Sequence, residues 1–321
     1  MKIHLPNSAF LGNIDAFIRS FDPANPDALE VTFNEKWMSL HPLVLSMTAS
    51  LGLLAKQNNS SIACRIPEAT SKHYLDVMGL NKFLPLPGTT IVKHEPAGRF
   101  IPLTQITNSR QLTDFITEMV PLLHTTPEQA EPIKYVISEL ARNVLEHASS
   151  PTGAIVCAQF FAKSNRISIG VADIGVGIKN TIKMAHPVSD DISAIELALT
   201  PGVTGTTSRL GGTESNAGAG LFFIKSIAKV NRDFFVLYSG TGMYKLLKTP
   251  LGHKIKLNAN PQLDKSTRKN DFPYWKGTSV GIDISLDSNE KFDKLLDLIR
   301  DVYRIDIRNK KKDKFKRARF I

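Results

Sequence analysis

One predicted helix, from Pro127 to about Ala148, carries two different stripes along its length. Thr126 precedes it as an N-cap, and Pro127 stands at its first position, where proline is tolerated. The apolar stripe has the spacing of a helix packed on a core and consists of Ile133, Ile137, Leu140 and Val144. The polar stripe has members four residues apart, which are Glu139, Asn143 and His147. We therefore expect one side of this helix to be buried while the other presents a line of polar groups.

The polar stripe has a chemical and a structural interpretation. A carboxamide such as Asn143 can hold a hydrated Mg²⁺, and a carboxylate one turn away, Glu139, can activate a water or a hydroxyl group. The structural alternative is a solvated helix face. For this cluster taken alone, the solvated face is the better interpretation.

Two glycine-rich clusters follow at a distance along the chain. Asp173-Ile174-Gly175-Val176-Gly177 comes after a predicted strand, where its glycines let the backbone approach a flat ligand and its carboxylate can accept an amino group. Gly218-Ala219-Gly220-Leu221 opens a predicted helix, whose free N–H groups suit a phosphate. Each motif alone is common in proteins without such a site.

The rest of the chain alternates between predicted strands and helices, which indicates an α/β fold. Strands are expected at 28–33, 60–66, 154–162, 166–172, 233–238, 243–248 and 278–286. Helices are expected at 42–56, 69–78, 109–123, 191–199, from about 219 onward, and at 290–303. Two prolines and a glycine between Glu95 and Leu103 predict a domain boundary there.

In this order and spacing, the clusters resemble one family. The region from about Ser109 to Leu286 is similar to the superfamily of gyrase, heat-shock chaperone, histidine kinase and mismatch-repair (GHKL) ATPases. Its N-box corresponds to Glu139-x-x-x-Asn143, its G1 box to Asp173-x-Gly175-x-Gly177, and its G2 box to Gly218-x-Gly220-Leu221. Lys225 falls where many members carry a lysine, and Gly277-Thr278 resembles the closing Gly-Thr pair of the family.

The resemblance implies an α/β sandwich, with a mixed sheet on one side and helices on the other, and ATP and Mg²⁺ as cofactors. In this interpretation Asn143 coordinates Mg²⁺, Asp173 binds the adenine amino group, and Gly218 and Gly220 hold the phosphates. Glu139 is the catalytic base, while His147, Gly175, Gly177, Leu221, Lys225 and Thr278 complete the ATP-binding set. The chain has no GxxxxGK[ST] sequence, so a Walker-type site is excluded.

Within the superfamily, Ser138 to Ala148 is most similar to bacterial anti-sigma-factor serine kinases. A histidine kinase would need a helix with a phosphoacceptor histidine followed by an acidic residue. His94-Glu95 runs directly into Pro96, and His124 leads into Thr-Thr-Pro, so neither fits. The resemblance therefore implies ATP hydrolysis or phosphorylation of a serine or threonine on a protein partner.

The N-terminal segment, about residues 25 to 90, resembles the STAS domain of anti-sigma-factor antagonists. The match is carried by Glu68, Ala69, Tyr74, Leu75, Met78, Gly79, Leu80 and Phe83. Ser39 falls near the position of the phosphorylated serine of that family, but the Asp-Ser-x-Gly signature is absent. A helix N-cap is therefore the better interpretation of Ser39.

The predicted organisation has three parts. Residues 1–100 form a STAS-like domain, residues 101–288 form the GHKL-type ATP-binding domain, and residues 289–321 form a helix with a basic tail. Within the second part, the Gly-, Thr- and Ser-rich stretch from Thr200 to Gly220 is predicted to be a lid over the site.

The positive charge of the chain is concentrated at one end. Net charge is +10, from 40 basic and 30 acidic residues. From Arg304 to Ile321, nine Lys or Arg residues stand against two Asp. This segment is either a surface for nucleic acid or an acidic partner, or a solvated tail.

Three functions remain open from the sequence. The first is an ATP-dependent regulatory enzyme, and the second is an ATP-gated interaction switch without turnover. The third is a nucleic-acid-associated ATPase that uses residues 304–321. The expected partner is a protein, with a homodimer as an open alternative and no membrane. Two distant cysteines, Cys64 and Cys157, and an N-terminus without a secretory pattern predict a cytoplasmic protein.

Overall fold

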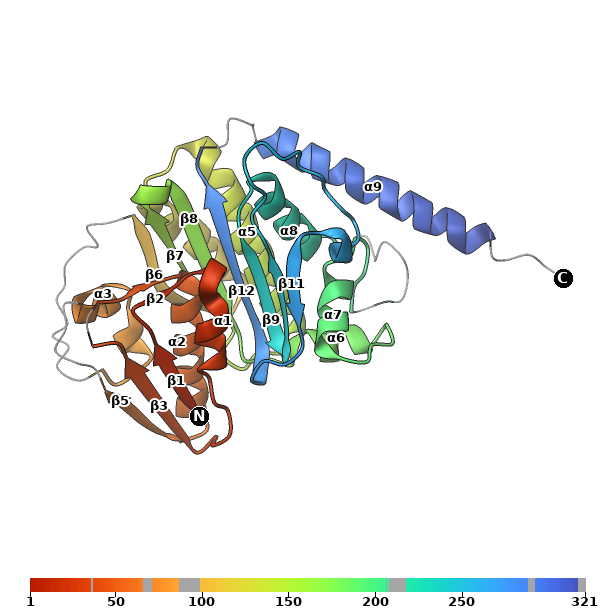
Figure 1. Ribbon diagram of the computed structural model, residues 1–321. Helices are drawn as coiled ribbons and strands as arrows, with labels where there is room; N and C mark the ends of the chain where they lie inside the picture. Colours follow the sequence, from red (N-terminus) through yellow and green to blue (C-terminus); the bar gives the residue numbers. More distant parts are fainter. Residues whose placement is uncertain are drawn as a thin grey trace.

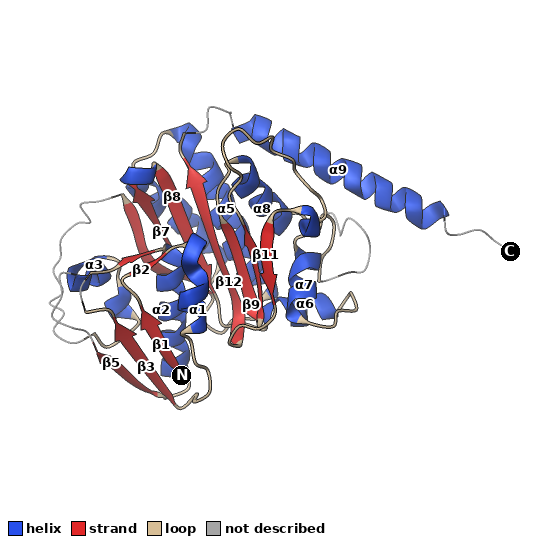
Figure 2. Ribbon diagram, viewed as in Figure 1, coloured by secondary structure: helices blue, strands red, loops and turns tan. Residues whose placement is uncertain are grey.

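The computed structural model of the chain shows an α/β fold, in which the described residues form three sheets with helices around them (Figures 1 and 2). The structure describes residues 1–35, 37–65, 71–86, 99–205, 207, 218–287 and 292–316. Within these ranges, no helix combines the length and the apolar character that crossing a bilayer requires.

The central element is a seven-stranded sheet with strand order β11-β10-β9-β12-β8-β7-β6. Its strands, in sequence order, are β6 Phe100–Ile106, β7 Ala154–Phe161, β8 Arg166–Ala172, β9 Phe235–Gly240, β10 Gly242–Leu246, β11 Ser266–Lys269 and β12 Trp275–Ser285. Each pairing between neighbours is antiparallel. The expectation of a mixed sheet in this region is therefore wrong.

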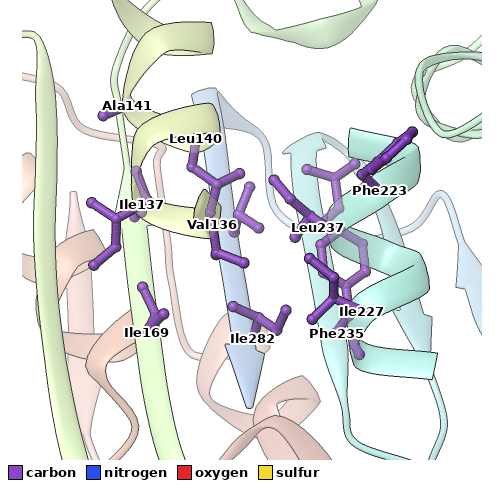
Figure 3. Packing of buried hydrophobic residues seen from close by; sticks show 14 of the residues in the cluster. Val136, Ile137, Leu140, Ala141, Ile169, Phe223, Ile227, Phe235, Leu237 and Ile282 are labelled. Atoms are coloured by element: carbon purple, nitrogen blue, oxygen red, sulfur yellow. The ribbon is translucent and has the colours of Figure 1, made fainter. Parts of the chain in front are cut away.

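One face of this sheet is covered by α5 (Pro127–His147) and α8 (Gly220–Val230). Both helices have a strongly one-sided apolar surface, which is why they lie flat on the strands. Figure 3 shows side chains of α5 and α8 meeting those of β8, β9 and β12 in a continuous core. The same face carries α6 (Gly177–Lys183) and α7 (Asp191–Ala198), and α4 (Ser109–Asp114) precedes α5, joined to it by helical turns at Phe115–Met119 and Val120–Leu123.

The other face is covered by the N-terminal part of the chain, chiefly by α2 (Pro42–Gln57). This helix also contacts the strands of a parallel three-stranded sheet, β1-β3-β5, so it lies between two sheets. A helix in that position is apolar on all sides, and α2 is buried along nearly its whole length. The remaining N-terminal elements are β1 Lys2–Leu5, β2 Ser8–Ala9, a turn of helix at Leu11–Asn13, α1 Ile14–Arg19, β3 Ala28–Phe33, β4 Ser39–Leu40, β5 Ser61–Arg65, α3 Ser71–Val77 and a turn at Leu80–Lys82.

Two paired glycines let α2 approach the sheet closely. Gly170 of β8 stands opposite Gly281 of β12. A Cβ atom on Gly170 would lie 2.2 Å from the backbone nitrogen of Leu43, so a side chain there would displace the start of the helix. The Ser46 hydroxyl also donates to the Gly170 carbonyl at 3.0 Å. The glycine pair therefore leaves a flat, side-chain-free surface on the sheet against which α2 packs.

A buried polar contact joins the same two parts. His41 is the N-cap of α2, and its Nδ1 accepts the Leu43 N–H at 3.0 Å. Its Nε2 lies 3.3 Å from the carboxylate of Asp283 on β12, which also accepts the Ser168 hydroxyl at 2.5 Å. Since His41 is the cap, Ser39 is not; Ser39 lies in β4 instead.

The boundary expected near residue 100 falls at the start of β6, yet the two sides of it share one core. Trp275 of β12 is buried against Phe21, with ring centroids 5.7 Å apart, and against Tyr238. Lys245 of β10 forms an ion pair with Asp15 of α1. Of the residues that carried the STAS resemblance, Glu68 and Ala69 lie outside the described residues.

The last helix, α9 (Phe292–Lys316), runs along the outside of α8 and extends beyond it (Figure 1). Its first half is fixed by the buried side chains of Leu295, Leu296 and Ile299. The predicted helix ended at Tyr303, so the observed one is longer and includes much of the basic segment.

Candidate functional site

The polar stripe of α5 lies along the wall of a cavity. The helix begins as predicted: the Thr126 hydroxyl accepts the Gln129 N–H, and Pro127 is the first helical residue. Its apolar stripe is buried against the sheet, so Glu139, Asn143 and His147 point away from the core. All three line a cavity of about 350 Å³, a volume within the range of small-molecule sites.

Asp173 fixes the base of the cavity, where β8 ends. Only 1% of this residue is exposed. Its carboxylate accepts the Gly175 N–H at 2.7 Å and the Thr278 N–H at 3.2 Å, while its carbonyl accepts the Trp275 indole N–H at 3.2 Å. The carboxylate therefore ties the turn after β8 to the start of β12.

Burial raises the pKa of Asp173 to about 7, and the two backbone hydrogen bonds oppose this rise. A carboxylate oxygen can accept more than one hydrogen bond. Asp173 can thus accept a further hydrogen bond from a bound molecule, and that hydrogen bond would stabilise the ionised carboxylate.

Gly277 is required for this arrangement because its φ is +101° and a Cβ atom would lie 2.3 Å from the Asp173 carbonyl oxygen. The pair Gly277-Thr278 was predicted from sequence. Thr278 lines the cavity beside Asp173.

The N-terminus of α8 meets α5 across the cavity. A Cβ atom on Gly220 would lie 2.7 Å from a carboxylate oxygen of Glu139, so only glycine allows this contact without displacement. Gly218 has a φ of +62° and also lines the cavity, as does Leu221. The cap position, Ala219, has no side-chain acceptor for the first N–H groups of the helix. Those groups are suited to an anion.

Most of the predicted residues are thus brought together from distant parts of the chain. Those that line the cavity are Glu139, Asn143, His147, Asp173, Gly177, Gly218, Gly220, Leu221 and Thr278. Gly175 lies just outside it, where a Cβ atom would be 2.1 Å from the Ala148 carbonyl oxygen, and it serves the site by donating to Asp173.

Lys225 is not placed with the others. Its side chain is buried, and its ammonium group lies 2.6 Å from the Asp264 carboxylate and 3.1 Å from the Asn258 carbonyl oxygen. Lys229 approaches the same carboxylate at 3.9 Å. We correct the sequence prediction accordingly: Lys225 holds α8 to the segment before β11, and it does not face the cavity.

Several cavity residues were not identified from the sequence. They include Tyr135, Arg142 and Thr181, whereas Thr204 and Gly205, which also line the cavity, belong to the segment predicted as a lid. Tyr135 and Arg142 lie next to the predicted stripe, one turn before Glu139 and one residue before Asn143, so a wider stripe would have found them. Thr181 lies on α6, a helix that was not predicted. It is close to Gly205, because a Cβ atom on Gly205 would lie 2.5 Å from the Thr181 carbonyl oxygen.

The charges around the cavity are unbalanced. Glu139, Glu146 and Asp173 contribute carboxyl groups, whereas Arg142 is the only Lys or Arg among the described residues that line it. The Arg142 guanidinium lies 3.3 Å from Glu139 and 3.9 Å from Glu146. Burial raises the pKa of Glu139; Arg142 lowers it and Glu146 raises it further. A polyanion would bind here only with an accompanying cation.

The described residues contain no group of three or more His, Cys, Asp or Glu side chains arranged for a metal ion. A metal at this site would therefore take most of its ligands from a bound molecule and water, as Mg²⁺ commonly does. The Asn143 carboxamide oxygen is a suitable ligand for such a metal, while its buried Nδ2, which has no hydrogen-bond partner among the described residues, can donate to a bound molecule.

About half of the segment predicted as a lid, Thr200 to Gly220, lies outside the described residues, which omit 206 and 208–217. A scan of the chain against models of known protein families finds no match, and a comparison with curated proteins finds none.

Proposed function

We propose that the protein binds Mg-ATP in this cavity, in the manner of the GHKL superfamily. The observation that supports the proposal is the convergence of the three predicted boxes. Glu139 and Asn143 on α5, Asp173 after β8, Gly220 at the start of α8 and Thr278 in β12 line one cavity although they span 140 positions of sequence. The excess of carboxyl groups around the cavity is compatible with ATP binding, because the triphosphate would bind together with its own cation.

Each group in the cavity has a role in this proposal. Asp173 accepts the amino group of adenine, with Thr278 beside it. The N–H groups at the start of α8 face the phosphates, assisted by Arg142. Asn143 would hold Mg²⁺ through its carboxamide oxygen. Glu139 is placed at the same end, against Gly220, where it would orient or deprotonate the attacking hydroxyl group or water.

The proposed reaction is hydrolysis of ATP or phosphorylation of a serine or threonine on a protein partner. The raised pKa of Glu139 supports a role as a base, because a base works best when its pKa is nearer to the operating pH. In the same proposal, residues 101–288 are the GHKL-type domain. Residues 1–100, with their parallel strands and α2, are a STAS-like unit that takes part in recruiting the partner.

An ATP-gated switch without turnover is the second candidate. The Arg142 guanidinium lies 3.3 Å from Glu139. An ion pair of this kind stabilises the charged carboxylate and makes it a weaker base. Turnover measurements on Glu139 variants separate the two candidates.

Calorimetric titration with Mg-ATP tests the binding site. Asp173→Asn replaces the charged acceptor by a group that also donates, so we expect affinity to fall by about 1.5–3 kcal/mol. Asp190→Asn is the matched control, because Asp190 caps α7 outside the cavity and asparagine caps equally well. Equal affinity of wild type and Asp173→Asn would contradict the proposed site.

A further inference from the structure

The C-terminal half of α9 is charged in a way that the nucleotide site does not explain. Residues 292–303 contain two basic and three acidic side chains, whereas residues 304–316 contain seven basic and two acidic ones. The helix is 25 residues long, or about 37 Å. Its uncharged, buried side chains lie in the first half, so the charge is carried where the helix extends past α8 (Figure 1).

The two sides of this half of the helix differ in their charges. Asp306 and Lys310 are partly buried and pair with each other at 2.6 Å, and Lys310 also reaches the Pro201 carbonyl oxygen at 3.4 Å. The exposed side carries Arg304, Arg308, Lys311 and Lys312. Among the described side chains, Arg308, Lys311 and Lys312 have no acidic partner within 4.0 Å. On the outer side Arg304 lies 3.6 Å from Asp301, whereas Arg308, Lys311 and Lys312 keep an unpaired charge within the described part of the chain.

We propose that this outer side of α9 binds the phosphate backbone of a nucleic acid. Its cations follow one another at intervals of one to four residues, about 1.5–6 Å along the helix axis. Duplex DNA carries one negative charge per about 1.7 Å of its axis, so it offers an unbroken row of partners to such an array. A protein surface interrupts its carboxylates with other groups and matches such a dense array of cations less well.

Two further observations favour a contact without base specificity. Between residues 304 and 316 the basic side chains are mostly lysines, which bind phosphate as point charges rather than as forks that read base edges. The rest of the chain is nearly neutral, since residues 304–321 supply most of the net charge. Residues 304–321, most of which belong to α9, are thus the main electrostatic attraction for a polyanion, whatever the cavity binds.

The test is fluorescence anisotropy of the full chain with labelled duplex DNA and with single-stranded RNA of equal length. The variant Arg308→Gln/Lys311→Gln/Lys312→Gln removes three cations from the outer side of α9. Lys163→Gln/Lys254→Gln/Lys265→Gln removes the same charge from exposed positions on the body. Because all six positions are exposed, both variants should fold, which circular dichroism verifies.

We expect wild type to bind at least one probe with a steep dependence on salt. Loss of three phosphate contacts should lower the slope of log K against log salt by about 2–3 and weaken binding on the order of 10²-fold at about 0.1 M salt. The body variant should lose much less. The relative affinity for DNA and RNA then identifies the source of the phosphates.

Three outcomes would overturn the proposal. One is the absence of binding to both probes at low salt. Another is an equal loss in both variants, which would show that only net charge matters. The last is equally tight binding to polyglutamate, which would indicate an acidic protein partner. None depends on ATP, so failure here leaves the proposed nucleotide site untouched.

Discussion

Asp173 is the residue through which the two edges of the cavity are connected. Its backbone and side chain together make four hydrogen bonds, to the turn after β8 and to β12, including one from its own N–H to the Thr278 carbonyl oxygen at 2.9 Å. It is nonetheless a carboxyl group with almost no exposure, and its pKa is raised mainly by that burial. A buried acid without a bound cation destabilises the fold when it ionises, a cost that structural carboxylates usually avoid by pairing.

This predicts a specific pH dependence. The pKa of Asp173 is raised from 3.8 to about 7 on folding, so between these values the folded chain binds a proton that the unfolded chain has lost. The free energy of unfolding should therefore fall as pH rises from about 4 to about 7, and level off above. Urea unfolding at several pH values, compared with Asp173→Asn, isolates this contribution. The decline should be smaller with saturating Mg-ATP; the same pH profile in wild type and variant would contradict the prediction.

Glu139 allows a second prediction at the same scale. Glu139→Gln keeps the shape of the side chain beside Gly220 but removes its basicity. We expect Mg-ATP affinity within a few-fold of wild type and turnover reduced by about 10²–10⁴-fold, the usual contribution of a general base. Phosphate release and phosphorylation of co-purified proteins measure this. Glu131→Gln, on the same helix but outside the cavity, is the control. Unchanged turnover in Glu139→Gln would remove Glu139 from the reaction.

At the scale of the elements, the packing of α2 on the two glycines can be tested by two alanine substitutions that should differ in severity. In Gly170→Ala the new Cβ would lie 2.2 Å from a backbone atom of α2, which cannot move alone. In Gly281→Ala the nearest atoms are side-chain methyl groups of Leu11 and Leu43, at 2.7 and 2.9 Å, which can rotate away. We expect about 3 kcal/mol of destabilisation for the first and about 1 kcal/mol for the second. Urea denaturation would show the reverse order, or no difference, if α2 were not seated there.

Elements with strong local signals were predicted well from the sequence. The cap and proline of α5 gave its start, and β8 has the predicted limits, 166–172. α6 was missed because its first residue is Gly177, a residue that normally weakens a helix. β1 and α1 were missed because they are only four and six residues long.

The candidate site was predicted through spacing, and the error at Lys225 shows the limit of that method. The position of a residue in a helix indicates which face of the helix it lies on, but not which residue from another element it contacts. The partner, Asp264, lies 39 residues further on. No local pattern in the sequence predicts the ion pair between Lys225 and Asp264. The packing of α2 on β8 is equally absent from any local pattern. An isolated glycine inside a strand, such as Gly170 in β8, can indicate a close backbone approach, but it does not identify the segment that approaches.

At the scale of the whole molecule, the shared core predicts a single unfolding transition. The two tryptophans make this measurable, because Trp37 is exposed whereas Trp275 is buried against Phe21 of the N-terminal part. In a Trp37→Phe background, Trp275 fluorescence reports separation of the two parts, and circular dichroism reports loss of the helices. We expect the same midpoint in denaturant for both. An earlier fluorescence midpoint would show that residues 1–65 detach first.

Domains joined by a linker can be exchanged during evolution, since each keeps its own surface. The close fit of α2 to Gly170 and Gly281 removes that freedom. Without α2, backbone and apolar side chains of β7, β8 and β12 would be exposed to solvent. Conversely, α2 could not pack on a sheet that had side chains in place of the two glycines. We therefore expect residues 1–65 and the seven-stranded sheet to be retained together, because a gene fusion or truncation near residue 100 would divide one packed core.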